Sequence, residues 1–220
     1  MMNDCQYCEE FERGYLDLNG KSLGNRILLE TDNFVVFPTL GQIVEGYLLI
    51  APKKHYLAIG EIPRANYKEL EEVQGKVKTI LSETYGSPLF FEHGATSRKK
   101  RGGCCIEHAH IHAVPVQVEI LGDLSKVFGH KKIRDYNGLK TKFEREEPYF
   151  FLEDNFGRKY SFDIPDVVPS QYIRRIISEK IGKQERWDWR SQPGLEELEN
   201  TLRKLKGKFD AKIKLNKVTK

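Results

Sequence analysis

The sequence predicts an α+β fold, in which an antiparallel sheet carries one packed helix and a small C-terminal α+β extension follows. Two observations support this prediction. Short apolar segments between glycine, proline and polar residues recur over residues 26–115, which is typical of strands. One longer segment among them, residues 63–84, repeats apolar residues at helical spacing. A single helix among several strands favours a helix packed on an antiparallel sheet.

The first half of the chain supplies these elements in order. Pro63 suits the first turn of the long helix, and Gly86 ends it. The apolar residues between them fall on one face, with Glu and Lys on the other. Four segments are apolar, short and bounded by turn-forming residues, so we expect strands there: residues 26–37, as two strands with a turn at Asp32–Asn33, residues 47–51, residues 88–92 and about residues 107–115.

From residue 119 onward we expect a smaller unit. Its predicted elements are a short helix at 119–128, a polar connector, a hairpin turning at Asp154–Gly157, a helix capped by Ser170 and ended by Gly182, and a helix over Leu195–Leu205. We therefore divide the chain into 1–118, the main domain, 119–147, the connector, 148–206, the C-terminal α+β extension, and 207–220, a basic tail that we expect to be disordered. The extension covers the core, caps the site or mediates association.

Composition and charge favour a globular protein without a membrane segment. The 220 residues are 39% hydrophobic and 31% charged. No apolar run approaches the ~18 residues that span a bilayer, and the N-terminus lacks the basic and apolar regions of a secretory signal. We therefore expect a cytoplasmic protein. Basic residues cluster at 97–103 and 203–220, where they are either simply solvated or attract phosphate.

Three of the six histidines lie at alternate positions, His108, His110 and His112. Because side chains alternate across a strand, all three would share one face, while the apolar residues between them would point into a core. A neutral imidazole donates and accepts hydrogen bonds, binds metals and acts as a nucleophile. A row of imidazoles therefore favours a functional site over a strand that is histidine-rich by chance.

A pair of cysteines opens the chain as Cys5-Gln-Tyr-Cys8. Without a secretory signal, this spacing favours half of a metal site over a disulfide. Two thiolates need two further ligands to complete a tetrahedral zinc site. The alternative is that both cysteines are free thiols.

Together these motifs resemble the histidine-triad superfamily, in its zinc-containing form with a CxxC pair. The resemblance covers residues 5–116 and rests on four segments in the same order: the cysteine pair, the strand ending in Pro52-Lys-Lys-His55, the Gly-rich approach that ends at Gly103, and the His-x-His-x-His motif followed by two apolar residues. It implies an antiparallel sheet with a packed helix, and a nucleotide as ligand.

By this resemblance, Cys5, Cys8, His55 and His108 are the ligands of one zinc ion. Four protein ligands leave no open coordination position, so the zinc would be structural. It would tie the N-terminus to the histidine motif. If His55 is instead a surface residue, the two thiols stay free.

The resemblance also assigns the chemistry. His110 is the expected nucleophile on the α-phosphorus of a nucleotide, and water would hydrolyse the nucleotidyl-histidine intermediate. A backbone carbonyl near His108 would fix the tautomer of His110. His112 is expected to donate to phosphate oxygens and to assist the leaving group. A histidine at this third position is typical of the hydrolase branches, whereas the nucleotidyltransferase and phosphorylase branches carry glutamine.

Six residues are candidates for nucleotide or phosphate binding: Thr39, Gly103, Cys104, Cys105, Ile27 and Phe37. The backbone amides of 103–105 would bind phosphate, and Thr39 would contact the ribose. Ile27 and Phe37 would line a base pocket or belong to the core. The sequence departs from the family at two of these positions, because many members have glutamine in place of Cys104 and aspartate or asparagine in place of Thr39.

We therefore expect a nucleotide hydrolase that acts on the α-phosphate of a dinucleoside polyphosphate or a nucleoside phosphoramidate. Two alternatives stay open, namely transfer of the nucleotidyl group to phosphate or sugar, and a non-catalytic module that binds a nucleotide or RNA. Many relatives pair two subunits through one continuous sheet, so a homodimer is a further expectation. Nucleic acid is the less favoured partner, and no membrane partner is expected.

Overall fold

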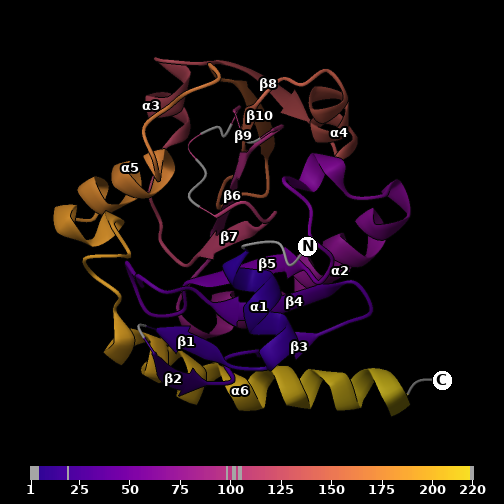
Figure 1. Ribbon diagram of the computed structural model, residues 1–220, viewed down its shortest axis with the longest axis vertical. Helices are drawn as coiled ribbons and strands as arrows, with labels where there is room; N and C mark the ends of the chain where they lie inside the picture. The colour runs from indigo at the N-terminus through magenta and orange to yellow at the C-terminus, as the bar shows by residue number, and fades with distance from the viewer. Residues whose placement is uncertain (1–4, 19, 98, 101–102, 104–105, 219–220) are drawn as a thin grey trace.

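The computed structural model describes residues 5–18, 20–97, 99–100, 103 and 106–218, and it confirms the predicted fold class. Eight strands form one antiparallel sheet in the order β3-β4-β5-β7-β6-β9-β10-β8, and two further strands form a separate hairpin (Figure 1). The strands are β1 (Leu16–Leu18), β2 (Lys21–Gly24), β3 (Leu29–Glu30), β4 (Phe34–Pro38), β5 (Leu48–Pro52), β6 (Leu89–Gly94), β7 (Ile111–Val114), β8 (Gly129–Ile133), β9 (Tyr149–Glu153) and β10 (Lys159–Asp163).

Helices cover both faces of the large sheet. The α-helices are α1 (Gln6–Arg13), α2 (Tyr67–Thr84), α3 (Leu121–Ser125), α4 (Asn137–Glu144), α5 (Tyr172–Lys180) and α6 (Leu195–Val218), and the short 3-10 helices are η1 (Ile59–Glu61), η2 (Arg64–Asn66) and η3 (Gln184–Trp187). α2 packs on one face, while α5 packs on the other through Ile173 and Ile177. The sheet is therefore the middle layer of the protein.

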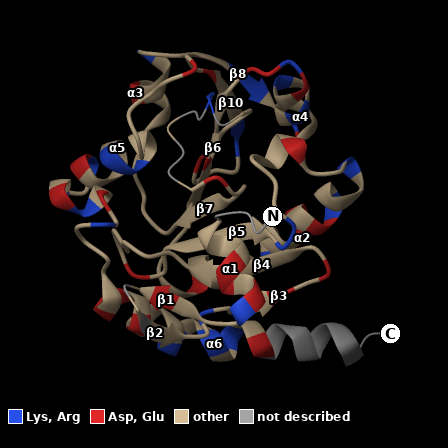
Figure 2. Ribbon diagram, viewed as in Figure 1, with Lys and Arg blue, Asp and Glu red and all other residues tan. Residues whose placement is uncertain are grey.

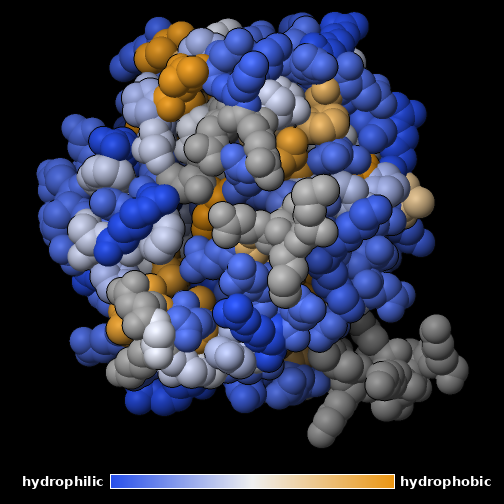
Figure 3. Space-filling view, viewed as in Figure 1, coloured by the Kyte–Doolittle hydropathy of each residue, from blue (hydrophilic) through white to orange (hydrophobic). Residues whose placement is uncertain are grey.

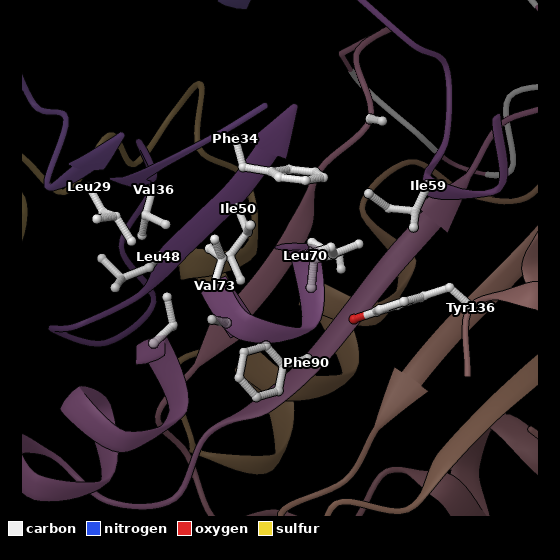
Figure 4. Packing of buried hydrophobic residues seen from close by; sticks show 14 of the residues in the cluster. Leu29, Phe34, Val36, Leu48, Ile50, Ile59, Leu70, Val73, Phe90 and Tyr136 are labelled. Carbon is white, nitrogen blue, oxygen red and sulfur yellow. The ribbon is translucent and has the colours of Figure 1, made fainter. Parts of the chain in front are cut away.

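The predicted long helix is α2, and its apolar stripe is the reason that it packs on the sheet. Leu70, Val73 and Val77 recur at three- and four-residue spacing and are almost fully buried. They meet inward-facing strand residues such as Ile50 and Phe90, as Figure 4 shows for part of this cluster. α2 ends at Thr84 with Tyr85 as its C-cap, and Gly86 follows with a φ of 124°, a left-handed value that favours glycine.

The strand that carries the three histidines is shorter than predicted. β7 begins at Ile111, so only His112 of the three lies within a strand. The backbone just before β7 does not pair with a neighbouring strand, because the N–H of Ala109 donates to the Tyr56 carbonyl at 2.6 Å. The predicted alternation still holds, since Ala109 and Ile111 join the core on the α2 side. The three histidines therefore lie on the other face of the sheet, the face on which α5 packs.

The second half of the chain extends the same sheet. β9 pairs with β6 along its whole length, with Phe91 opposite Leu152 and His93 opposite Phe150. The predicted hairpin is β9 and β10. β6 is thereby an interior strand, and β3 and β8 are the outer strands of the sheet. The division of the chain at residue 118 stays a prediction, but the sheet itself runs across it.

Two segments are more ordered than predicted. Residues 119–147, expected to be mostly a polar connector, hold α3, β8 and α4. β8 carries Gly-His-Lys-Lys-Ile at the sheet edge, where almost all of its side chains are exposed, so it shows no apolar alternation. The segment 207–220, expected to be disordered, is helical as far as Val218 because α6 continues past Leu205. Burial of Phe209 against the α2-side core explains this continuation.

The surface mixes charge of both signs. In Figure 2, Lys and Arg lie among Asp and Glu over the elements in view, without one large field of either sign. Figure 3 shows a mainly hydrophilic face with an apolar patch near α3. Within the described part of the chain, no helix combines the length and the apolar character needed to cross a membrane.

A buried carboxyl, Glu92 of β6, holds two segments against the sheet. It accepts hydrogen bonds from the Ile59 N–H at 2.7 Å and from the Tyr149 hydroxyl at 2.8 Å. Burial raises its pKa to about 8. Glu92 is therefore protonated in the folded state over a pH range in which it is ionised in the unfolded chain.

This difference predicts a loss of stability as the pH rises. An unfolded glutamate titrates near pH 4.5 and folded Glu92 near 8, so unfolding releases a proton between these values and becomes easier with increasing pH. Between pH 7 and 8 we expect the free energy of unfolding to fall by up to ~1.4 kcal/mol per pH unit, and Glu92→Gln to remove this slope. Urea titrations of both proteins measure it. Glu72→Gln, at an exposed position on α2, is the control, and equal slopes for all three proteins would contradict the prediction.

Candidate functional site

Two cysteines and two histidines converge into one candidate metal site. The ligand atoms of Cys5, Cys8, His55 and His108 all lie within 4.8 Å of one another. The Nδ1 of His108 is 3.4 Å from the Cys5 sulfur, and the Nδ1 of His55 is 3.4 Å from the Cys8 sulfur. A tetrahedral zinc ion, with Zn–S of about 2.3 Å and Zn–N of about 2.0–2.1 Å, sets sulfur–nitrogen separations of about 3.6 Å. The four residues fit a zinc ion.

Local structure explains how these ligands meet. Cys5 is the N-cap residue of α1, and Cys8 lies three residues further along, so one helical turn presents both sulfurs on the same side. His55 follows directly after β5. His108 donates from Nε2 to the Pro52 carbonyl at 2.7 Å, which leaves Nδ1 as the nitrogen that can bind a metal. The tautomer that a metal site needs is therefore already fixed.

His110 lies beside the metal cluster with one nitrogen held. Its Nδ1 is 2.6 Å from the backbone carbonyl of His108, so Nδ1 carries the proton and donates it. Nε2 is left with its lone pair, and the residue is 9% exposed, at the wall of a pocket. Burial lowers the pKa of His110 to about 4, although the carbonyl partly opposes this effect. At neutral pH the imidazole is uncharged, which is the nucleophilic form.

We assign His112 the opposite tautomer. Its Nδ1 is 2.8 Å from the hydroxyl of Tyr47, and burial raises the pKa of Tyr47 to about 12, so the phenol keeps a proton that it can donate to Nδ1. The Nε2 of His112 therefore carries a hydrogen that it can donate in turn. The ring stacks on Phe91 with centroids 4.3 Å apart, and its centroid is 4.6 Å from that of His110. The two imidazoles thus pair an acceptor with a donor.

The pocket beside these histidines is built by both halves of the chain. Thr39, His93 and Gly103 line it from the first half, together with His110 and His112. From the second half, Gln171, Arg174 and Trp189 line it as well. The pairing of β6 with β7 brings His93 to the pocket, with its ring centroid 5.9 Å from that of His112. Sequence reasoning missed the three residues of the second half, because tertiary packing brings them to the site and no local pattern marks them.

The other predicted binding residues have different positions. Thr39 lines the pocket, but its hydroxyl donates to the Leu40 carbonyl at 2.8 Å, so only its lone pairs face a ligand. Phe37 is fully buried in the apolar cluster next to the pocket, and Ile27 packs against the same cluster. Neither is among the described residues that line the pocket. Cys104 and Cys105 lie outside the described residues.

Comparison with known proteins gives distant likenesses. No family model matches the chain. CWF19-like protein 1 of Xenopus laevis is 22% identical over 196 residues, which is 81% of this chain and 35% of that protein. The chain thus spans about a third of the length of this curated relative.

Similar solved structures include proteins described as members of the histidine-triad family. One from Bacillus anthracis has a TM-score of 0.44 and 16% identity, over 54% of this chain and 77% of its own. One from Sulfolobus tokodaii, a hypothetical histidine triad nucleotide-binding protein, has a TM-score of 0.41 and 20% identity, over 64% of this chain and 90% of its own. A zinc-bound histidine triad family protein from Mycobacterium smegmatis has a TM-score of 0.42 and 15% identity, over 64% of this chain and 94% of its own. Because these TM-scores are below 0.5, the function is inferred from the chain's own residues.

The metal cluster makes a prediction that elemental analysis can check. We expect the chain expressed with zinc to carry about one zinc ion, and Cys8→Ser to lose it because a tetrahedral structural site needs all four ligands. Loss of the ion removes the link between α1 and His108, so Tm should fall by several degrees. His130→Ala, at an exposed histidine of β8, is the control. Full zinc content in Cys8→Ser, or none in the unaltered chain, would contradict the assignment.

Proposed function

We propose that this chain is a histidine-triad protein that hydrolyses a nucleoside monophosphate conjugate at its α-phosphate. The observation that carries the proposal is the hydrogen bond from His110 Nδ1 to the His108 carbonyl, which leaves His110 Nε2 unprotonated at the wall of the pocket. Dinucleoside polyphosphates and nucleoside phosphoramidates are the proposed substrates, because both have a leaving group on the α-phosphorus.

The first step forms a bond between His110 Nε2 and the α-phosphorus. The bond from phosphorus to the leaving oxygen or nitrogen breaks, and its electron pair goes to the leaving group. His112 donates a hydrogen bond from Nε2–H to the leaving atom and keeps its proton, so a phosphate departs as its anion and an amine takes its proton from solvent. The His110 ring becomes positively charged. The His108 carbonyl stabilises that charge, because it already accepts the Nδ1 hydrogen.

The second step returns the enzyme to its starting state. Water attacks the α-phosphorus and releases one proton to solvent, while the phosphorus–nitrogen bond breaks and its electron pair returns to His110 Nε2. The nucleoside monophosphate leaves, and the His110 ring is neutral again. Tyr47 keeps the His112 donor directed toward the pocket in each step, since its hydroxyl holds Nδ1.

Zinc has a structural role in this proposal. Cys5, Cys8, His55 and His108 would hold it, and four protein ligands leave no position for a substrate. When bound, it supplies a rigid link from α1 and β5 to the His108 backbone, and that backbone carries the carbonyl used by His110. No step of the reaction passes through it.

Association and location stay predictions. A homodimer would need to pair along β3 or β8, because β9 already occupies the free edge of β6. A cytoplasmic location and a nucleic-acid partner remain expectations from the sequence. Transfer of the nucleotidyl group to phosphate and binding without turnover are the alternatives that kinetic measurement separates from hydrolysis.

The nucleophile is tested by turnover. We expect His110→Ala to lower the release of nucleoside monophosphate from dinucleoside polyphosphates by at least ~10³-fold, because no second imidazole has a free nitrogen at the same place. Chromatography of the products in phosphate buffer and in neutral amine buffer measures it. Nucleoside diphosphate in the phosphate buffer alone would support transfer instead. Retained hydrolysis in His110→Ala, with His130→Ala as the control, would contradict the proposal.

The donor role of His112 is tested at Tyr47. Tyr47→Phe removes the hydroxyl that holds His112 Nδ1, so the ring loses its fixed tautomer and kcat should fall about ten- to a hundredfold with a smaller change in KM. Tyr67→Phe is the matched control, since the Tyr67 hydroxyl is buried without a hydrogen-bond partner among the described residues. Steady-state kinetics measure both variants. Equal kcat values for the two variants would show that Tyr47 does not direct His112.

A further inference from the structure

The start of α5, from Gln171 to Arg174, forms a wall of the histidine pocket and is fixed there at two points. The backbone N–H of Gln171 donates to the Gly103 carbonyl at 3.1 Å, and the N–H of Ile173 donates to His93 Nε2 at 3.3 Å. Both partners line the pocket. The start of α5 is therefore held by the same residues that border the triad.

Gln171 has an unusual environment for an amide. Its side chain is 4% exposed, and the backbone has a φ of 59°, in the left-handed region that residues other than glycine seldom occupy. Nε2 is 3.4 Å from the Asp188 carboxylate, which orients the amide and directs Oε1 away from it. Oε1 is buried and has no hydrogen-bond partner among the described residues. Because Gln171 lines the pocket and its Oε1 has no partner among the described residues, this oxygen is a candidate to accept a hydrogen bond from a ligand.

Arg174 is a second, independent feature of the same wall. Its guanidinium is 3% exposed, lies 5.1 Å from the centre of the Tyr47 ring and donates to the carbonyls of Gly41 and Trp187 at 2.7 and 2.9 Å. In the described part of the chain, no carboxylate forms an ion pair with it. Arg26, the other arginine of the pocket, is paired with Glu10. Arg174 is thus a buried cation that carbonyls orient and that no carboxylate of the described residues neutralises.

These two features point to one ligand chemistry. An anion neutralises Arg174, and a hydroxyl or amino hydrogen satisfies Gln171 Oε1. We propose that Gln171 and Arg174 bind the ligand directly, Arg174 at an anionic phosphate and Gln171 at a donor group of the attached nucleoside, so that the C-terminal extension supplies half of the binding site. The identity of the ligand as a nucleotide rests on the proposed function.

The structure also explains why this wall holds its shape. Gly41 has a φ of 69°, and a Cβ there would lie 2.2 Å from the Trp189 Cβ and 2.9 Å from an Arg174 nitrogen. The loop after β4 and the segment after α5 therefore pack directly against each other. This contact fixes Arg174 on a rigid support, which lowers the entropy cost of binding a phosphate there.

Calorimetric titration of the full chain with AMP and with GMP tests the proposal. Gln171→Leu removes the acceptor and breaks only one long hydrogen bond, so the protein should fold, with a Tm close to that of the unaltered chain. We expect the nucleotide with the better affinity to bind Gln171→Leu about tenfold more weakly. Arg174→Met should weaken binding further, and Arg174→Lys, which keeps the charge, should recover part of the loss. Arg175→Met is the control, because Arg175 is the exposed neighbour on the same helix.

The outcomes separate this inference from the proposed function. If the unaltered chain binds a nucleotide and Gln171→Leu binds it equally well, the role of Gln171 is wrong, and hydrolysis at His110 is untouched. If Arg174→Met and Arg175→Met weaken binding equally, the effect is one of net charge and the role of Arg174 is wrong. If the unaltered chain neither binds nor hydrolyses a nucleotide, the proposed function fails and this inference fails with it.

Discussion

His108 is the constraint on which the rest of the site depends. Its Nδ1 faces the two thiols, its Nε2 donates to the Pro52 carbonyl, and its own backbone carbonyl accepts the hydrogen of His110 Nδ1. One residue therefore sets the geometry of the metal cluster, the position of β5 and the tautomer of the proposed nucleophile. Rotation of this side chain would disturb all three at once, so a zinc ion held by the cluster would stabilise the geometry of His110 without contacting a ligand in the pocket.

The electrostatics of the pocket follow from burial. The pKa values of His93, His110 and His112 are all lowered, first by burial, so the imidazoles stay neutral at physiological pH. The positive charge of the pocket comes instead from arginine. Arg26 is paired with Glu10, whereas buried Arg174 has no carboxylate partner among the described residues. The proposed nucleophile, His110, and the buried cation, Arg174, come from different halves of the chain. The pairing of β6 with β9 joins these two halves in one sheet.

Local patterns predicted the parts of this structure that local physics decides. The spacing of Cys5 and Cys8 predicted half of a metal site, and the alternation around His110 predicted the row of imidazoles, because one helical turn and one extended segment fix those directions. The other two members of the metal cluster, His55 and His108, came from the family resemblance. The same reasoning missed β8, whose edge position leaves Lys131 and Lys132 exposed and gives no apolar period. It also missed Gln171 and Arg174, since their places depend on tertiary packing some 60 residues beyond the triad.

The most direct test of the account is the intact mass of the chain after brief incubation with dinucleoside polyphosphates and a non-acidic quench, followed by mapping of any modified peptide. A gain of one nucleotidyl mass, located on His110 and absent from His110→Ala, is the predicted result, because the bond from Nδ1 to the His108 carbonyl leaves His110 Nε2 with a free lone pair at the pocket. Hydrolysis without any adduct on the native chain, or an adduct that persists in His110→Ala, would contradict the account.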